Sequence, residues 1–341
     1  MRTILVTGGA GFIGSHFLIH AVKNYPDSLF INLDSLSYAS NLALLNEVNQ
    51  EDNYLFVRGD ICDQKLLNAL FSKYRINGVI HFAAQTHVDN SIVDPAPFIE
   101  TNINGTFALL QAAKSTWMTK SGFENARFHH ISTDEVYGSL SKEGSFFEES
   151  PLAPNNPYSA SKAASDMLVK SYYKTYGLNC VITHCSNNFG PGQHEEKLIP
   201  TIVRKAMKQE PIPLYGDGSH IRDWLFVKDH CHAIDLVFHK GVSGETYNIG
   251  GQDECSNLFL AKKICHLLDQ LSPKEDGSSY QSQIAFVADR PGHDWRYSID
   301  SSKLKNSLNW RPKTLFSHAL EQTVHWYYHH YLNTLELELC N

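Results

Sequence analysis

The chain has 341 residues, of which 42% are hydrophobic and 19% are charged, and its formal net charge is −7. This composition is typical of a globular protein with one large domain or two unequal ones, and it excludes a disordered or fibrous chain. The acidic balance argues against general affinity for nucleic acid or for anionic membrane surfaces, so we expect neither as a partner.

Short apolar runs alternate with helical patterns through the first half of the chain. Strands are expected at Thr3–Thr7, Leu29–Leu33, Tyr54–Val57, Gly78–Phe82 and Arg127–Ile131. Helices are expected from Gly11 towards Asn24 and, after Pro97, through Leu110. Strands that alternate with helices indicate right-handed βαβ units. We therefore predict an α/β fold with a Rossmann-like, doubly wound parallel sheet.

The second half is less regular. A helix is expected over Tyr158–Tyr176 and a strand over Asn179–Thr183, and beyond Gly190 the pattern loosens into loops, short strands and helices. We predict a nucleotide-binding domain over residues 1–190, with a later return of the chain near 224–250. Residues 191–330 are predicted to form a smaller C-terminal substrate-binding region.

The cysteines and the lengths of the apolar runs indicate where in the cell the protein is located. The seven cysteines are scattered and include no C-x-x-C pair, which favours reduced thiols in a cytoplasmic protein. No apolar run is long enough for a membrane span, and the first ten residues do not resemble a signal peptide. His230, Cys231 and His232 are adjacent and diverge around a helix, so we predict no metal site.

The strongest motif is a glycine-rich turn between the first strand and the first helix. Its residues are Gly8, Gly11, Phe12, Ile13 and Gly14. Glycines let the backbone approach a pyrophosphate, and the helix N-terminus offers free N–H groups. Asp34 ends the next strand, where a carboxylate accepts hydrogen bonds from the adenosine ribose. No arginine adjoins Asp34, which favours NAD over NADP as the cofactor.

A tyrosine and a lysine lie one turn apart on the second-half helix. Tyr158 and Lys162 share a helix face because residues four apart are neighbours. An ammonium lowers the pKa of a nearby phenol, so that tyrosine becomes a usable base. Such pairs are also common as a buried tyrosine beside a solvated lysine, and it is the cofactor motif that favours the catalytic interpretation.

Polar residues follow the fifth strand, where ligands of open α/β sheets bind. Thr133 can hydrogen-bond a hydroxyl that is being oxidised, and Asp134 and Glu135 follow immediately. A simple dehydrogenase needs no further acid and base, whereas the elimination of water needs two proton-handling groups. The alternative for this pair is an acidic turn in solvent.

With these motifs the chain resembles the extended short-chain dehydrogenase/reductase superfamily and, within it, the dTDP-glucose 4,6-dehydratases. The resemblance runs from Arg2 to about Tyr327. Its family-specific segments are Thr133–Glu135, Ser186–Pro191, Glu196–Pro200, Ile221–Trp224 and Ala288–Asp294.

The resemblance implies a reaction. Tyr158 would take the proton of the sugar 4-hydroxyl while hydride passes from C4 to NAD, with Thr133 orienting the 4-oxygen and Lys162 holding the nicotinamide ribose. Glu135 would then remove the C5 proton while Asp134 protonates the departing 6-hydroxyl. Hydride would return to C6, which converts dTDP-glucose to dTDP-4-keto-6-deoxyglucose.

The resemblance also implies binding residues. Further cofactor contacts are expected at Asp60, Ile61, Ala83 and Ala84. Substrate contacts are expected at His87, Asn187, Lys197, Arg222, Arg290 and His293. For Arg222 and Arg290 the alternative is an ion pair with the neighbouring aspartate. Asn187 could instead cap a turn, and His87 could be a structural histidine.

Three positions depart from the family pattern. Gln85 and Thr86 stand where the family usually has Glu and Ser, and Phe189 stands where Tyr is usual. The last departure removes a hydroxyl. The catalytic set is intact, so the departures bear on details of the cofactor and sugar contacts.

A homodimer is also implied by the resemblance, built on the helices near Phe98–Trp117 and Tyr158–Tyr176. Met167, Leu168 and Tyr172 would lie in that interface or, alternatively, in the intramolecular core.

Other functions stay open at this stage. The same chemistry on a UDP-linked hexose would differ only in contacts to the base. A sugar-nucleotide 4-epimerase shares the glycine motif and the Tyr–Lys pair but has no need of two carboxylates. A non-catalytic cofactor-binding protein has no need of the Thr133, Tyr158 and Lys162 set. The product would serve rhamnose or another deoxysugar.

Overall fold

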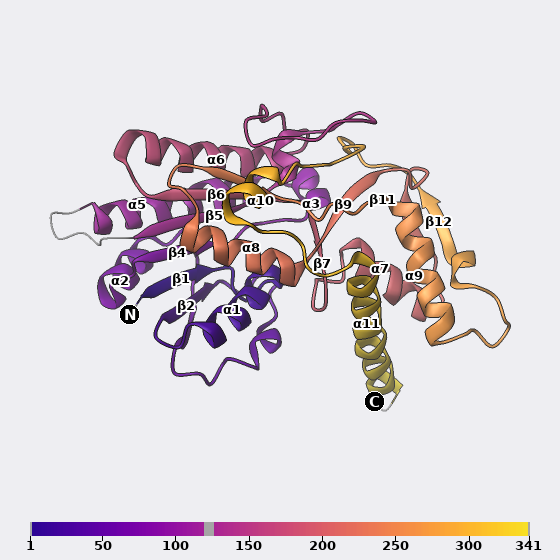
Figure 1. The fold of residues 1–341 in the computed structure, drawn as a ribbon. Coiled ribbons are helices and arrows are strands. Elements are labelled where there is room, and N and C mark those ends of the chain that lie inside the picture. Colours follow the sequence, from indigo (N-terminus) through magenta and orange to yellow (C-terminus); the bar gives the residue numbers. More distant parts are fainter. Residues whose placement is uncertain (1, 119–125, 340–341) are drawn as a thin grey trace.

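A sheet of seven parallel strands dominates the computed structural model, which describes residues 2–118 and 126–339 (Figure 1). The strands are β1 (Thr3–Thr7), β2 (Leu29–Asp34), β3 (Tyr54–Arg58), β4 (Gly78–His81), β5 (Arg127–Thr133), β6 (Cys180–Cys185) and β10 (Thr246–Ile249). Their order is β10-β6-β5-β4-β1-β2-β3, so the direction of winding reverses between β1 and β4. This confirms the predicted Rossmann-like, doubly wound fold.

The two strands that carry the reacting end of the sheet are longer than predicted. β5 and β6 stay in register to their last residues, with Ser132 opposite His184 and Thr133 opposite Cys185. The predicted strands ended at Ile131 and Thr183, where the apolar run stops. The sequence pattern follows side-chain burial, whereas the strand continues as long as its backbone is paired. Thr133 is therefore held by the sheet itself.

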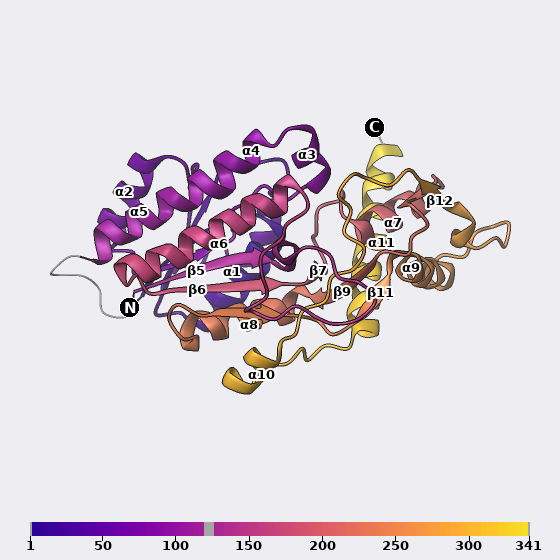
Figure 2. The same cartoon turned by 90° about the horizontal axis from the view of Figure 1, so that it is seen from above.

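Helices cover both faces of the sheet, as Figures 1 and 2 show. One face carries α1 (Phe12–Asn24) and α8 (Val227–Lys240), and the other carries α2 (Gln64–Tyr74), α5 (Thr106–Trp117) and α6 (Pro157–Tyr176). Because both faces are covered, strands such as β4 and β6 are buried along their whole length. The sequence analysis predicted α1 and α6 closely but did not predict α2.

Helix α6 begins and ends at strong local signals. Asn156 accepts a hydrogen bond from the backbone N–H of Ser159, and the Ser159 hydroxyl reaches back to the N-cap backbone. Pro157 occupies the first turn, and Gly177 ends the helix in the left-handed conformation. These caps fix where Tyr158 and Lys162 enter the site.

The long helix predicted after Pro97 is not uniform. It consists of α4 (Ala96–Phe98), a π-helical segment labelled η2 (Ile99–Gly105) and α5. π-helical segments are rare in proteins, and many of those that do occur lie at functional sites. Here it places Asn102 between the loop after β4 and helix α6.

The C-terminal half adds two small sheets and further helices beside the main sheet (Figure 2). Strand β9 (Ile221–Phe226) pairs with β7 (Asn187–Phe189) and β11 (Glu254–Ser256), and β8 (Ile212–Tyr215) pairs with β12 (Ile284–Val287). The remaining helices are α3 (Val88–Val93), α7 (Leu198–Met207), α9 (Asn257–Leu271), α10 (Ser302–Leu308) and α11 (Phe316–Leu339). Short 3₁₀ segments are η1 (Leu42–Leu45), η3 (Asp134–Tyr137) and η4 (Tyr280–Gln283).

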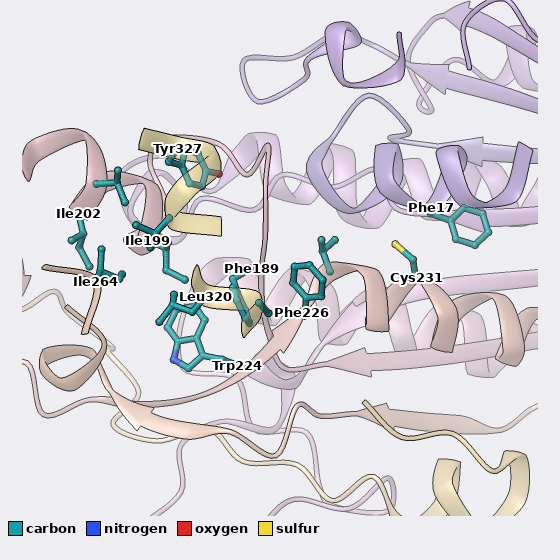
Figure 3. Packing of buried hydrophobic residues seen from close by; sticks show 14 of the residues in the cluster. Phe17, Phe189, Ile199, Ile202, Trp224, Phe226, Cys231, Ile264, Leu320 and Tyr327 are labelled. Carbon is teal, nitrogen blue, oxygen red and sulfur yellow. The ribbon is translucent and has the colours of Figure 1, made fainter. Parts of the chain in front are cut away.

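One hydrophobic cluster joins the two halves (Figure 3). It runs from Phe17 and Cys231, on α1 and α8, through Trp224 and Phe226 of β9 to Leu320 of α11. After α8 the chain returns to the main sheet as β10, within the range 224–250. The division into domains at residue 190 stays a prediction.

Helix α11 was not expected from the sequence. Its buried residues Leu320, Val324 and Tyr327 complete the core beside α7 and α9, and the Tyr327 hydroxyl donates to the Gln193 carbonyl oxygen at 2.6 Å.

Among the described residues no helix is long and apolar enough to cross a membrane. The six described cysteines are free thiols.

Candidate active site

A cavity of about 370 Å³ opens at the C-terminal ends of the main-sheet strands. Most residues predicted to bind or react line it: Gly8, Gly11, Phe12, Ile13, Gly14, Asp34, Asp60, Ile61, Ala83, Ala84, Thr133, Asp134, Glu135, Tyr158, Lys162, Asn187 and Lys197. This is the edge at which open α/β sheets bind ligands.

The glycine-rich turn leaves no room for side chains. Gly8 has φ +72°, and a Cβ there would lie 2.6 Å from the Ala83 backbone nitrogen. A Cβ on Gly14 would lie 2.3 Å from the carbonyl oxygen of Gly8. No described side chain caps the start of α1, where Gly11 is the N-cap. The turn therefore presents free N–H groups to the cavity and fits a pyrophosphate.

Asp34 is fixed at the end of β2. Its Oδ2 accepts from the Ala10 N–H at 2.9 Å, and its Oδ1 accepts from the Leu36 N–H and the Ser40 hydroxyl at 2.8 and 2.9 Å. A carboxylate has about four lone-pair sites, so acceptor capacity remains for ribose hydroxyls. The sequence analysis had identified Asp34 but not the three residues that hold it.

Asn102 anchors the loop that follows β4. Its side chain accepts from the Gln85 N–H at 2.8 Å and donates to the Gln85 carbonyl oxygen and the Ser161 hydroxyl, at 3.1 and 2.8 Å. The loop that carries Ala83 and Ala84 is thereby tied to α6. No sequence motif pointed to Asn102, because its position depends on the π segment.

Tyr158 and Thr133 both line the cavity, and Thr133 is one of the influences that lower the pKa of the Tyr158 phenol. Burial, and then the charge of Glu135, raise the pKa of Tyr158 well above its ordinary value. The Lys162 ammonium donates to the Ile131 carbonyl oxygen at 2.8 Å, and burial lowers its pKa to about 8. Burial dominates the pKa of Tyr158, and the ammonium is bound to a backbone carbonyl group, so the expectation that Lys162 lowers the pKa of Tyr158 stays a prediction.

The two carboxyl groups of η3 are held in different surroundings. Asp134 is 2% exposed, and burial together with the Glu135 charge raises its pKa well above the usual range. Burial also raises the pKa of Glu135, but three cations, Arg290, Arg222 and Lys197, oppose it. Oδ2 of Asp134 and Oε2 of Glu135 have no partner among the described residues.

The pKa values of both carboxyl groups are raised, but only that of Glu135 is opposed mainly by cations, and this difference is compatible with an acid at Asp134 and a base at Glu135. A carboxyl group with a raised pKa retains a proton that it can donate, and a carboxylate beside cations can accept one. The alternative of an acidic turn in solvent does not fit the burial of Asp134.

Two of the predicted substrate contacts, Asn187 and Lys197, line the cavity. The Oδ1 atom of Asn187 is buried and has no partner among the described residues, so Asn187 does not merely cap a turn through this atom. Lys197 donates to the Thr86 carbonyl oxygen at 3.3 Å, and its Nζ lies 3.3 Å from Oε1 of Glu196. His87 lies outside the lining and caps α3 by accepting from the Asn90 N–H at 3.2 Å.

Arg222 and Arg290 do not line the cavity. Arg222 donates to three backbone carbonyl groups, those of Ile221, Asp294 and Trp295, at 2.8, 2.9 and 3.3 Å. Arg290 lies 3.3 Å from Oδ1 of Asp89. Neither guanidinium forms the ion pair with the neighbouring aspartate that the alternative interpretation had supposed, although the Arg290 backbone N–H donates to Oδ1 of Asp289 at 2.9 Å. Both are close enough to Glu135 for their charges to lower its pKa.

His293 belongs to a compact cluster with His220 and Asp289. Its ring stacks on His220 with centroids 3.7 Å apart, and its Nδ1 lies 2.6 Å from Oδ1 of Asp289. In the described part of the chain these three residues place ligand atoms within 4.8 Å of one another. Burial, followed by the charge of Arg290, lowers the pKa of His293 to about 4. Asp289 contacts both histidines, at 2.6 Å for His293 and 3.2 Å for His220, and thereby orients the two rings.

The departures from the family pattern fall in two environments. Gln85 and Thr86 line the cavity. Phe189 lies in the core instead, with its ring 5.5 to 6.2 Å from those of Phe316, Phe226 and Trp224. The missing hydroxyl at Phe189 therefore changes packing beneath the site rather than a contact in the cavity.

Known proteins are similar to this chain in fold and in sequence over nearly its whole length. Residues 5–323 match the family described as GDP-mannose 4,6 dehydratase. The dTDP-glucose 4,6-dehydratase of Xanthomonas campestris pv. campestris (strain B100) is 51% identical over 329 residues, which cover 96% of this chain and 93% of that protein. A crystal structure of a dTDP-glucose 4,6-dehydratase from Streptomyces venezuelae with NAD and TYD bound has a TM-score of 0.87 at 45% identity, covering 96% and 97% of the two chains. A UDP-glucose 4-epimerase from Thermotoga maritima with UDP-glucose has a TM-score of 0.84 at 29% identity, covering 98% and 100%.

Proposed function

The chain belongs to the dTDP-glucose 4,6-dehydratase family, and from that membership we propose how its own residues convert dTDP-glucose to dTDP-4-keto-6-deoxyglucose. It is an NAD-dependent nucleotide-sugar lyase. The observation that carries the assignment is the buried pair Asp134 and Glu135, which lies beside Tyr158 and Thr133 in one cavity. Oxidation alone needs no such pair.

The cofactor site fits a dinucleotide. We assign the pyrophosphate to the turn between Gly8 and Gly14, the adenosine ribose to Asp34 and the nicotinamide ribose to Lys162. Bound NAD supplies the hydride acceptor for the oxidation and the hydride donor for the final reduction. Asp60 and Ile61 line the same cavity and are assigned to the adenine side.

The first step is proton removal at the sugar 4-hydroxyl. Tyr158 is the proposed base, and Thr133, which lines the same cavity, is assigned to hold the 4-oxygen. Because burial raises the pKa of Tyr158, positive charge must approach the phenol before it can act. Lys162, four residues further along α6, is the cation that the chain provides.

The second step is the loss of water. A ketone at C4 acidifies the C5 proton, which Glu135 removes as the general base. Asp134 keeps its proton because burial raises its pKa, and it can give that proton to the departing 6-hydroxyl. Asn187 and Lys197 are proposed to hold the sugar, and Arg222 and Arg290 to provide the positive surroundings of its diphosphate. His293, whose pKa is lowered to about 4, is proposed to contact the diphosphate as a neutral hydrogen-bonding ring.

The decisive experiment uses dTDP-glucose that carries deuterium at sugar C4. Purified protein should release one water and retain the label, at C6 of the product, as measured by mass spectrometry and NMR. Unchanged substrate would refute the thymidine assignment, and the experiment would then be repeated with UDP-glucose. Inversion at C4 without loss of water would instead identify an epimerase.

We also propose a homodimer built on η2, α5 and α6. Ile99, Phe107 and Met167 are apolar side chains on these elements that are 51%, 44% and 59% exposed. Tyr172, by contrast, is buried in the core, and Leu168 packs against it. Sedimentation of the protein and of a Phe107→Glu, Met167→Glu double variant tests the proposal, because only an interface on these helices would yield monomers.

A cytoplasmic location and a role in rhamnose or another deoxysugar pathway complete the proposal. The free thiols and the nucleotide-sugar substrate support that location. Cell fractionation and the sugar composition of a deletion strain test the two points separately.

A further inference from the structure

A buried group of polar side chains lies behind Lys162, and we refer to it as the Asp166 cluster. Its members are Ser132, Tyr137, Asp166, His184 and Asn248, each at most 4% exposed. Only Ser132 among them lines the cavity. Buried charge is unfavourable unless it is paired and hydrogen-bonded, so such a cluster requires a physical reason.

Hydrogen bonding determines the protonation of His184. The Tyr137 hydroxyl donates to Oδ1 of Asn248 at 2.9 Å, so towards Nδ1 of His184, 2.6 Å away, it can only accept. The orientation of the Asn248 amide is fixed because its nitrogen donates to the Phe146 carbonyl oxygen. On the other side of the ring, Nε2 lies 3.0 Å from Oδ2 of Asp166. Both ring nitrogens are therefore donors, which is the imidazolium form.

Asp166 is the anion that balances these charges. It also accepts from the Ser132 hydroxyl at 3.1 Å. Burial alone would raise the pKa of Asp166, but the charge of His184 and a contact with His130 lower it well below its usual range. His130 is held neutral, because burial and the Lys162 charge lower its pKa to about 4.

The Asp166 carboxylate lies one turn beyond Lys162 on α6. Burial lowers the pKa of Lys162 to about 8, and Asp166 is the main influence that opposes this. The titratable groups around Lys162 are Tyr158 and Asp166 from α6, His81 from β4, His130 from β5 and Cys185 from β6. Burial raises the pKa of the Cys185 thiol and lowers that of His81, so both are neutral, and Asp166 supplies the negative charge among these described groups.

We propose that Asp166, paired with a protonated His184, is a positioning residue that keeps Lys162 charged and joins the Asp134–Glu135 turn to helix α6. The second part follows from Tyr137, which lies in η3 with both carboxyl groups and is bound to His184. The inference rests on the proposed function for the role of Lys162. The charge coupling itself can be measured without turnover.

The test is the pH dependence of NAD affinity and of kcat in the Asp166→Asn variant of the full-length protein. Loss of the carboxylate should move the alkaline limb of both profiles about one pH unit lower, because the Lys162 ammonium loses its anion. At pH 7.5 NAD should bind about threefold more weakly and at pH 9 about ninefold, whereas at pH 6 it should bind nearly as in the parent protein. A uniform loss at all pH values would overturn the proposal and leave Asp166 a structural role only.

A second variant is expected to give the opposite shift. His184→Asn removes the imidazolium, so the Asp166 charge is no longer balanced by His184 and the alkaline limb should move to higher pH. A general loosening of the site would not shift the two variants in opposite directions. Ser165→Ala is the matched control on α6: it removes a buried hydroxyl that contacts backbone carbonyl groups, and it should leave the limb unshifted. Because calorimetry measures NAD affinity directly, these shifts can be tested even if the protein has no activity on dTDP-glucose.

Discussion

The two sides of the cavity are built from different parts of the chain. The cofactor side is mainly backbone: the glycine turn, the first turn of α1 and the ends of β1, β2 and β4, with Asp34 as its fixed anion. The substrate side depends on charged side chains from distant loops, with Lys197, Arg222 and Arg290 acting on Glu135. A binding site formed by tightly packed backbone has no room for added atoms, so a single added methyl group should disrupt it. A site formed by several charges should instead lose affinity in steps as single charges are removed. The two sides should therefore respond differently to substitution.

The largest effect is expected where the two sides meet. Tyr158→Phe removes the proposed base while leaving the cavity shape, so kcat should fall by roughly 10³-fold or more. NAD affinity should change little, because the glycine turn and Asp34, which are assigned to the dinucleotide, are unaltered. Steady-state kinetics and calorimetry measure the two quantities. A variant with nearly normal kcat would show that Tyr158 is not the base.

On the cofactor side, a single methyl group should be enough to disrupt binding. Gly8→Ala places a Cβ 2.6 Å from the Ala83 nitrogen at a φ of +72°, so NAD affinity should fall by roughly 100-fold, in line with a strain of about 1–3 kcal/mol. Gly144→Ala is the matched control, because Gly144 has φ +88° with no atom within 4 Å. It carries the same backbone strain and should lose stability only. Equal NAD affinity in the two variants would contradict a backbone-built site.

On the substrate side, the response should be graded. Arg290→Gln removes a cation that lowers the pKa of Glu135, so the acid limb of kcat should move to higher pH and KM should rise about tenfold. Arg290→Lys keeps the charge and should leave the acid limb in place while still raising KM. If both variants moved the limb equally, the effect would come from packing rather than from charge.

This difference also explains what the sequence could predict. The glycine turn and Asp34 follow from a short motif between one strand and one helix, and the spacing of Tyr158 and Lys162 places them on one helix face. These are local rules, and the structure brings all four features into one cavity. Asp166 obeys the same rule, since it lies four residues after Lys162, and that spacing was the signal that could have revealed it.

The substrate side has no comparable local rule. Arg222 is held by the carbonyl groups of Asp294 and Trp295, more than seventy residues further along the chain. Arg290 pairs with Asp89, which is 201 residues away. Such partners depend on how β9 and the loop before α10 pack, and no spacing in the sequence encodes them. The sequence could name these arginines only through family resemblance, and the alternative of an ion pair with the neighbouring aspartate did not anticipate these distant partners.

The smallest effect expected is a gain in stability at the carboxyl pair. In the folded protein burial and Glu135 raise the pKa of Asp134 above its unfolded value, so the associated stability is present at low pH and is lost as pH rises through the folded pKa. Asparagine carries no charge at any pH, so the Asp134→Asn variant does not lose this stability as pH rises. The variant should be inactive, yet its Tm at pH 8 should exceed that of the parent by about 1–2 °C, a gain of about 1 kcal/mol.

At pH 4 the stability difference should largely disappear, because Asp134 is then protonated in the parent as well. Asp27→Asn, at an exposed turn, is the control and should leave Tm unchanged at both pH values. A lower Tm for Asp134→Asn at pH 8 would show that the Asp134 carboxylate stabilises the fold. The pair would then not be strained, and the argument that Asp134 is held protonated as the acid of the elimination would lose its basis.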